Sequence, residues 1–138
     1  MDRLVTVATV TVECIDAVAA ARFWRDFLGY EIRANHTRSV HLYDPSGHGP
    51  DLLLAWTDEA KAAKNRIHLD LRPADQDAAV ARAVTLGATL ADIGQTGDES
   101  WVVLHDPVGN EFCILQTPED LKNWEATGHP PTLPDLLS

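Results

Sequence analysis

The alternation of apolar and polar positions changes period twice in the first part of the chain. Over Val5–Cys14, β-branched residues alternate with other residues, which is typical of a strand with one buried face. From Asp16, whose carboxylate is suited to cap a helix, the apolar positions follow the helical period as far as Leu28. Gly29 is suited to the left-handed conformation that ends a helix. Three more strands are predicted, at about 30–35, 39–43 and 51–56.

The same order of elements is predicted a second time. A strand over residues 67–71 precedes a helix that Asp75 caps and that Gly87 follows, and further strands are predicted at about 88–93, 101–105 and 111–116. The pairs Leu-Gly at 28 and 86 and Asp-Pro-x-Gly at 44 and 106 recur in the same order. Leu-Gly alone is a common helix end, and Asp-Pro-x-Gly alone is a common turn. Because both recur in the same order, they predict a duplicated βαβββ unit.

This duplication predicts an α+β protein with a single domain over residues 1–138. The two modules are expected at about 5–56 and 66–116. Thr117 and Pro118 resemble the start of a helix, which is predicted to reach about Ala126. The proline-rich tail that follows has two interpretations, a flap or subunit contact formed by its leucines or an untethered terminus.

The length and the charge limit the function classes. A chain of 138 residues is long enough for one sizeable core. Eleven Lys and Arg against 21 Asp and Glu leave a net charge of -10, which repels phosphate backbones and anionic lipid headgroups. We therefore expect neither nucleic acid nor a membrane surface as a partner.

The cysteines and the hydropathy pattern suggest a cytoplasmic location. The two cysteines, Cys14 and Cys113, are not part of a Cys-x-x-Cys pair, which fits a reducing compartment. The chain has neither the pattern of a secretion signal nor an apolar run long enough for a membrane span. We expect a soluble cytoplasmic protein.

Three segments of the sequence resemble a known protein family. They are Arg22-Phe23-Trp24 before Leu28-Gly29-Tyr30, the run from Asn65 to Leu71, and Asp106-Pro107-Val108-Gly109-Asn110-Glu111-Phe112-Cys113. Together they resemble the vicinal oxygen chelate superfamily, specifically its small glyoxalase-like and bleomycin-resistance-like proteins. The resemblance implies that the two βαβββ modules form an open, cupped mixed-sheet barrel that holds a small molecule, often around a divalent metal. It also implies a homodimer.

Strand alternation then sorts the side chains between the core and the cup. The positions expected to face the helices are Leu52, Leu54, Ile67, Leu69, Val102, Leu104, Phe112 and Ile114. Trp24 and Trp56 are also expected in the core. The cup positions with the chemistry to contact a ligand are Thr9, Glu13, His41, Tyr43, Asp51, Trp101, His105 and Cys113.

The resemblance places the metal ligands of the superfamily at Thr9, Asp51, His68 and Cys113. Of these four, His68 alone is a standard ligand, because Thr9 is a poor donor and Cys113 stands where active relatives have a glutamate. These changes argue against an extradiol dioxygenase and remove the base of a glyoxalase I reaction. Asp51, His68 and Cys113 could still bind zinc with a water as the fourth ligand. The alternative is that Cys113 only packs and no cofactor is bound.

Two functions remain open on these residues. The first is a metal-free protein that binds a small organic molecule, neutral or cationic, in its cup. The second is a lyase or isomerase in which His68 transfers a proton beside a carbonyl group. Asp70 lies two positions after His68 on the same strand face, close enough to influence its charge. The alternative is that Asp70 only satisfies a hydrogen bond of His68 and that neither residue is catalytic.

Overall fold

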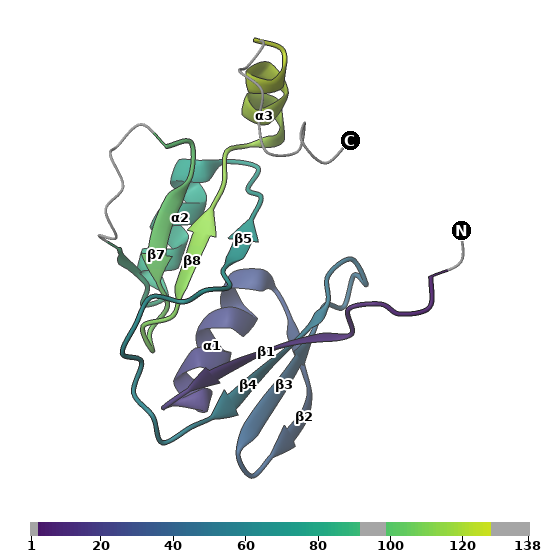
Figure 1. Cartoon of the computed structure of the whole chain (residues 1–138), viewed down its shortest axis with the longest axis vertical. Helices are drawn as coiled ribbons and strands as arrows, with labels where there is room; N and C mark the ends of the chain where they lie inside the picture. The colour runs from purple at the N-terminus through teal and green to yellow at the C-terminus, as the bar shows by residue number, and fades with distance from the viewer. Residues whose placement is uncertain (1–2, 92–98, 128–138) are drawn as a thin grey trace.

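Two βαβββ units follow one another in the structure, a computed structural model that describes residues 3–91 and 99–127 (Figure 1). The first unit comprises β1 (Thr9–Cys14), α1 (Ala17–Leu28), β2 (Glu31–His36), β3 (Ser39–Tyr43) and β4 (Asp51–Trp56). The second comprises β5 (Leu69–Leu71), α2 (Gln76–Thr85), β6 (Thr89–Leu90), β7 (Val102–His105) and β8 (Glu111–Ile114). A third helix, α3 (Pro118–Glu125), follows the second unit.

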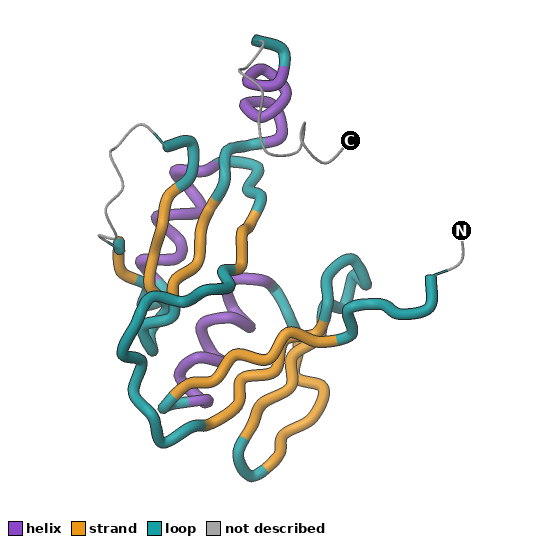
Figure 2. The backbone as a smooth tube through the Cα atoms, viewed as in Figure 1, coloured by secondary structure: helices purple, strands orange, loops and turns teal. Residues whose placement is uncertain are grey.

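Each unit folds into a four-stranded mixed sheet, and both sheets have the same strand order. The orders are β1-β4-β3-β2 and β5-β8-β7-β6. In each sheet the first strand pairs in parallel with the last, and the remaining pairs are antiparallel. Figure 2 shows the two sheets as separate groups of strands with a helix against each. The predicted α+β class and the duplicated βαβββ order are confirmed.

The helices begin and end where local chemistry directs them. The side chain of Asp16 accepts a hydrogen bond from the Ala19 N–H at 2.9 Å, and Asp75 accepts one from the Ala78 N–H at 3.0 Å. Both carboxylates therefore cap otherwise unpaired helical donors. Gly29 ends α1 with a φ of 70°, a conformation that costs glycine no steric clash.

The repeated Asp-Pro-x-Gly segments form the same turn in both units. The Gly47 N–H donates to the Asp44 carbonyl at 3.0 Å, and the Gly109 N–H donates to the Asp106 carbonyl at 2.9 Å. In each turn the aspartate Oδ1 also accepts a hydrogen bond from the N–H two residues later. Asp44 accepts from Ser46 at 2.8 Å, and Asp106 accepts from Val108 at 3.0 Å. These side-chain bonds explain why aspartate begins both turns.

The two units meet in one aromatic core. Trp24 of α1 lies 4.9 Å from Phe112 of β8, measured between ring centroids, in an edge-to-face arrangement. The Trp24 Nε1–H donates a 3.0 Å hydrogen bond to Asp106 Oδ2, and both residues are almost fully buried. Burial raises the pKa of Asp106, although hydrogen bonds from Trp24 and from the turn amides oppose this rise. The first helix is thus bonded directly to the second unit.

Most of the predicted core positions are buried, but two predictions were wrong. Ile67 is 79% exposed because β5 begins only at Leu69, so the strand alternation does not extend to residue 67. Trp56 is 37% exposed and lies under the guanidinium of Arg38, 3.8 Å from its ring centroid, instead of in the core. Trp24 is buried, as expected.

Several strands are shorter than the alternation predicts. β1 begins at Thr9, not at Val5, because Thr9 is the residue that lies opposite Asp51, the first residue of β4. Val5 and Val7 precede the paired region and are exposed. The predicted strand 88–93 is observed as Thr89–Leu90, with residues 92 and 93 outside the described part, as is the tail from residue 128.

Within the described residues, the helices are too short or too polar for a membrane span.

Replacing Trp24 with Phe tests the bond between the units. Trp24→Phe keeps an aromatic ring but leaves Asp106 Oδ2 buried without its donor, so we expect the free energy of unfolding to fall by about 2–4 kcal/mol. Urea denaturation measures this loss. The matched control is Trp56→Phe at the exposed tryptophan, where we expect less than about 1 kcal/mol. Equal losses in the two variants would contradict the importance of this bond.

Candidate functional site

A groove of about 590 Å³ lies between β1 and the segment that leads into β5. Its apolar lining comes from Val10, Val12, Trp24, Ile67, Leu69 and Phe112. Its polar lining comes from Thr11, Glu13, Asn65, Arg66, Asn110 and Glu111. Within the described residues, β1 is an edge strand of the first sheet and β5 is an edge strand of the second. The groove therefore lies between one edge of each sheet. Its position at the junction of the units makes it the candidate binding site.

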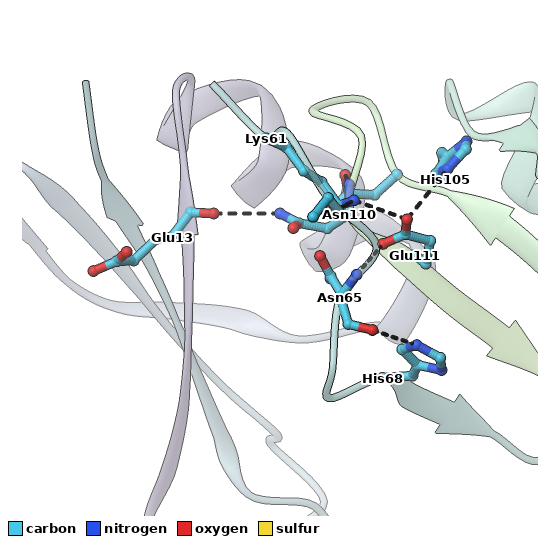
Figure 3. A network of polar contacts seen from close by, with 9 residues as sticks. Glu13, Lys61, Asn65, His68, His105, Asn110 and Glu111 are labelled. Carbon is cyan, nitrogen blue, oxygen red and sulfur yellow. Dashed lines mark hydrogen bonds and ion pairs between the residues drawn. The ribbon is translucent and has the colours of Figure 1, made fainter. Parts of the chain in front are cut away.

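A buried carboxylate organises one wall of this groove (Figure 3). Glu111, at the start of β8, is 5% exposed. Its Oε1 accepts a hydrogen bond from Lys61 Nζ at 2.8 Å, and its Oε2 accepts one from the Asn65 N–H at 3.0 Å. Burial would raise the pKa of Glu111, but these two donors outweigh it and lower the pKa. Glu111 is therefore a charged anchor for the connection between the units.

The network continues from this anchor to two further residues. The ring Nε2 of His68 lies 2.9 Å from the Asn65 carbonyl oxygen. A carbonyl only accepts, so Nε2 must carry the proton and the lone pair of a neutral ring lies on Nδ1. On the other side, Asn110 Nδ2 donates to the Glu13 carbonyl at 3.3 Å, across the groove to β1. Asn65 thus positions His68, and Asn110, the neighbour of Glu111 in the chain, contacts the β1 edge separately.

Three potential ligand groups come together on β5 and β8. The ligand atoms of His68, Asp70 and Cys113 all lie within 4.8 Å of one another. Asp70 and Cys113 are directly opposite in the parallel pairing of β5 with β8. Cys113 is buried, and burial, reinforced by the negative charge of Asp70, raises its pKa to about 11. The thiol is therefore protonated near neutral pH. This nitrogen, oxygen and sulfur set could hold a metal ion.

The first unit carries a separate polar cluster around Asp51. Asp51 Oδ2 lies 2.8 Å from His41 Nε2 and 3.5 Å from Arg33 Nε. Asp51, which was expected to share a metal with His68 and Cys113, is not a member of the group that these two form with Asp70. Arg33 supplies a positive charge beside Asp51, and the His41 ring is within hydrogen-bond distance of the same oxygen.

The other expected ligand contacts are dispersed over the two sheets. Glu13 lines the groove, and His105 Nε2 lies 3.7 Å from Glu111 Oε1 at its edge. Tyr43 donates its hydroxyl to Glu31 at 2.8 Å, and Thr9 lies opposite Asp51 on the sheet of the first unit. Trp101 is 45% exposed just before β7 and does not line the groove. Of the expected ligand contacts, the structure therefore places Glu13 in the lining of the groove and the others, His105 included, outside it.

The sequence interpretation did not assign a role to several residues of the groove. Asn65, Arg66 and Asn110 belong to the segments that carry the family resemblance but were given no role there, and Lys61, which supports the groove through Glu111, lies in a polar connector without a strand or helix pattern. One signal was available for Glu111: it is an acidic residue at the start of a strand that is otherwise apolar, Glu111–Ile114. A charge at such a position requires a partner if it is buried.

The comparisons with known proteins agree with this architecture. The family model described as a glyoxalase-like domain matches residues 9–115. No curated protein shows a significant match. Among solved structures, the trypanothione-dependent glyoxalase I of Leishmania major is 16% identical, with a TM-score of 0.64, over 88% of this chain and 93% of that chain.

Two of the similar structures are binding proteins by name. TnmS3, an antibiotic binding protein from Streptomyces sp. CB03234, is 22% identical, with a TM-score of 0.61, over 85% of this chain and 99% of its own. The bleomycin-binding protein of Streptomyces verticillus, solved with copper(II)-bleomycin, is 18% identical, with a TM-score of 0.57, over 84% of this chain and 98% of its own. The TM-scores of these three structures show a shared fold. The chain belongs to the glyoxalase-like domain family, within the vicinal oxygen chelate superfamily.

Replacing Glu111 with Gln tests the anchor through its pH dependence. The pKa of Glu111 is lowered in the folded chain, so its contribution to stability is present above about pH 4.5 and is lost as the pH falls below that value. We expect the free energy of unfolding to decline less steeply between pH 5 and pH 3 in Glu111→Gln than in the wild type, measured by urea denaturation. Lys61→Met removes one lowering donor and should reduce the slope in the same direction. An unchanged slope in both variants would be inconsistent with the anchor.

Proposed function

We propose that this protein binds a small organic molecule, neutral or cationic, in the groove between β1 and β5. The observation that carries the proposal is the groove itself, whose volume of about 590 Å³ falls within the range of about 300–1,000 Å³ that is typical of small-molecule sites. Its lining combines apolar side chains with carboxylate and amide groups. Such a lining suits a molecule with an apolar body and a few polar substituents.

The charge of the groove favours a neutral or cationic ligand. Glu13 and Glu111 both line it, and the chain as a whole has a net charge of -10. Glu111 is already neutralised by Lys61, whereas Glu13 is exposed on the β1 edge and available to a ligand. Arg66 supplies one positive side chain on the opposite wall, which suits a ligand that also carries an acceptor.

The proposal does not require the metal-ligand set of the superfamily. Thr9 is a poor ligand, and Asp51 is engaged by His41 and Arg33. Two of the similar structures are an antibiotic binding protein and a bleomycin-binding protein, which supports a binding role for the shared fold. A cytoplasmic location and a homodimer remain predictions. Exposed Leu4 and Val5 give a physical motive for association.

A melting-shift screen with a blocked groove tests the binding role. We expect a compound among a panel of neutral and cationic aromatic molecules, bleomycin included, to raise the melting temperature. A ligand at 100 times its Kd adds about 2.7 kcal/mol to the free energy of unfolding. Thr11→Trp places a bulky ring at an exposed position that lines the groove, and should abolish the shift.

The matched control is Thr89→Trp on β6, an exposed strand position that does not line the groove. This variant should bind as the wild type does. A shift that survives in Thr11→Trp, or that disappears equally in both variants, would place the ligand elsewhere. A panel without any stabilising compound would count against the binding role.

A second candidate function is a lyase or isomerase reaction at His68. One observation favours it: the bond from Nε2 to the Asn65 carbonyl leaves Nδ1 unprotonated in the neutral ring, ready to accept a proton. A divalent ion near the site would polarise a substrate carbonyl, whereas an ion bound to Nδ1 itself would occupy the lone pair that this reaction uses. Asp70 on the same face would stabilise the positive ring after proton transfer. Cys113 remains protonated and is not assigned a step.

Deuterium exchange tests this second function without knowledge of the natural substrate. If His68 transfers protons beside a carbonyl, the protein in D₂O should introduce deuterium at that carbon in members of a panel of small aldehydes and ketones, followed by ¹H NMR. His68→Gln should abolish the exchange and retain the far-ultraviolet circular dichroism of the wild type. His48→Gln, in the exposed turn after β3, is the control and should retain full exchange. Equal exchange in all three proteins would eliminate the reaction at His68.

A further inference from the structure

His68, Asp70 and Cys113 lie on one face of the second sheet, away from helix α2. Phe112 and Ile114, the neighbours of Cys113 on β8, are buried in the core that includes α2. Side chains alternate along a strand, so Cys113 points to the opposite face, where it packs with Ala91 and Val103. Parallel partners share a face, so Asp70 lies on this side as well. His68 precedes β5, and its ring reaches the same face because its ligand atom lies within 4.8 Å of those of Asp70 and Cys113.

The three side chains supply donor atoms that belong to one class of metal ion. Imidazole nitrogen, thiolate sulfur and carboxylate oxygen are the ligands that zinc takes in proteins, and an ion that binds Cys113 would displace the thiol proton into solvent. Their atoms lie within 4.8 Å of one another. Ligands about 2.0–2.3 Å from a tetrahedral zinc are separated by roughly 3.5 Å. The group is therefore looser than a metal-bound set, and the ligand side chains would have to move closer together when an ion binds.

Residues behind the group hold it ready for an ion. The Asn65 carbonyl accepts the His68 Nε2 proton, which is the arrangement that orients metal-bound histidines and leaves the other nitrogen free. Asn65 is itself held by its N–H bond to the buried Glu111. Ala91, Val103 and Leu115 surround Cys113 and shield the thiol from water on its inner side. The exposed Asp70 leaves the outer side open to an incoming ion.

We propose that His68, Asp70 and Cys113 form a divalent-metal site, best suited to zinc, that the second unit holds by itself. It differs from the arrangement across both units that the resemblance implied, because Asp70 replaces a ligand from the first unit. Three protein ligands leave the fourth tetrahedral position for water or a substrate oxygen. The inference goes beyond the proposed binding function and does not depend on the groove.

Cobalt titration of the full chain tests the site directly. Co²⁺ serves as an optical probe for zinc because a thiolate ligand gives it an intense near-ultraviolet charge-transfer band. We expect one equivalent of Co²⁺ to produce this band and Zn²⁺ to abolish it, with one equivalent of zinc by elemental analysis. Cys113→Ser should eliminate the band. Cys14→Ser, at the other buried cysteine, is the matched control and should retain it.

Substitution of Asp70 and of Asp51 distinguishes the proposed site from a metal site that spans both units. Asp70→Asn should weaken Co²⁺ binding by at least about tenfold, whereas Asp51→Asn should leave the affinity unchanged. The reverse result, or an unaltered band in Asp70→Asn, would overturn the proposal, as would the absence of a charge-transfer band in the wild type. If Cys113→Ser fails to fold, His68→Gln at a partly exposed position provides the same test.

The two proposals fail independently of each other. Thr11→Trp, which blocks the groove, should bind Co²⁺ with the wild-type affinity. Asp70→Asn should retain the melting shift with a groove ligand, since Asp70 does not line the groove. A loss of the metal band in Thr11→Trp would show that the metal group depends on the junction between the units, contrary to the proposal.

Discussion

The hydrogen bond between Trp24 and Asp106 is the contact on which the arrangement of the two units depends. It joins the first helix to the turn that precedes β8, 82 residues later in the chain, and both partners are buried. A buried indole N–H and a buried carboxylate each require a partner, so separation of the units would leave two unsatisfied polar groups. Phe112 packs against the same indole and adds apolar contact. Trp24 and Phe112 also line the groove.

A second set of polar contacts ties the groove to the chemistry on β5. Glu111 fixes the connector through Lys61 and Asn65, and Asn65 in turn orients His68. Asn65 therefore belongs both to the lining of the groove and to the hydrogen bond that orients His68. A ligand that displaced Asn65 would change the environment of His68, which gives the two sites a physical route for communication.

The outcome for individual strands shows where sequence patterns are reliable. The bounds of 39–43 and 51–56 were predicted as observed, because β3 and β4 lie inside a sheet where one face is apolar and both edges are paired. The predictions were too long at the edge strands β1, β5 and β6, and also at β8, which lies inside the second sheet and ends at Ile114 instead of residue 116. An edge strand has one partner, so its length depends on where that partner begins. This information is absent from local alternation.

The amino-acid sequence by itself determined the duplicated order of elements, the caps at Asp16 and Asp75 and the two Asp-Pro-x-Gly turns, because each depends on contacts within a few residues. It also brought His68 and Cys113 forward as candidates for one site. Only the tertiary structure decided that Asp70 accompanies them instead of Asp51, and that Glu111 is a buried anchor. These assignments depend on the register between strands and on the packing of one unit against the other, which residues far apart in the chain establish together.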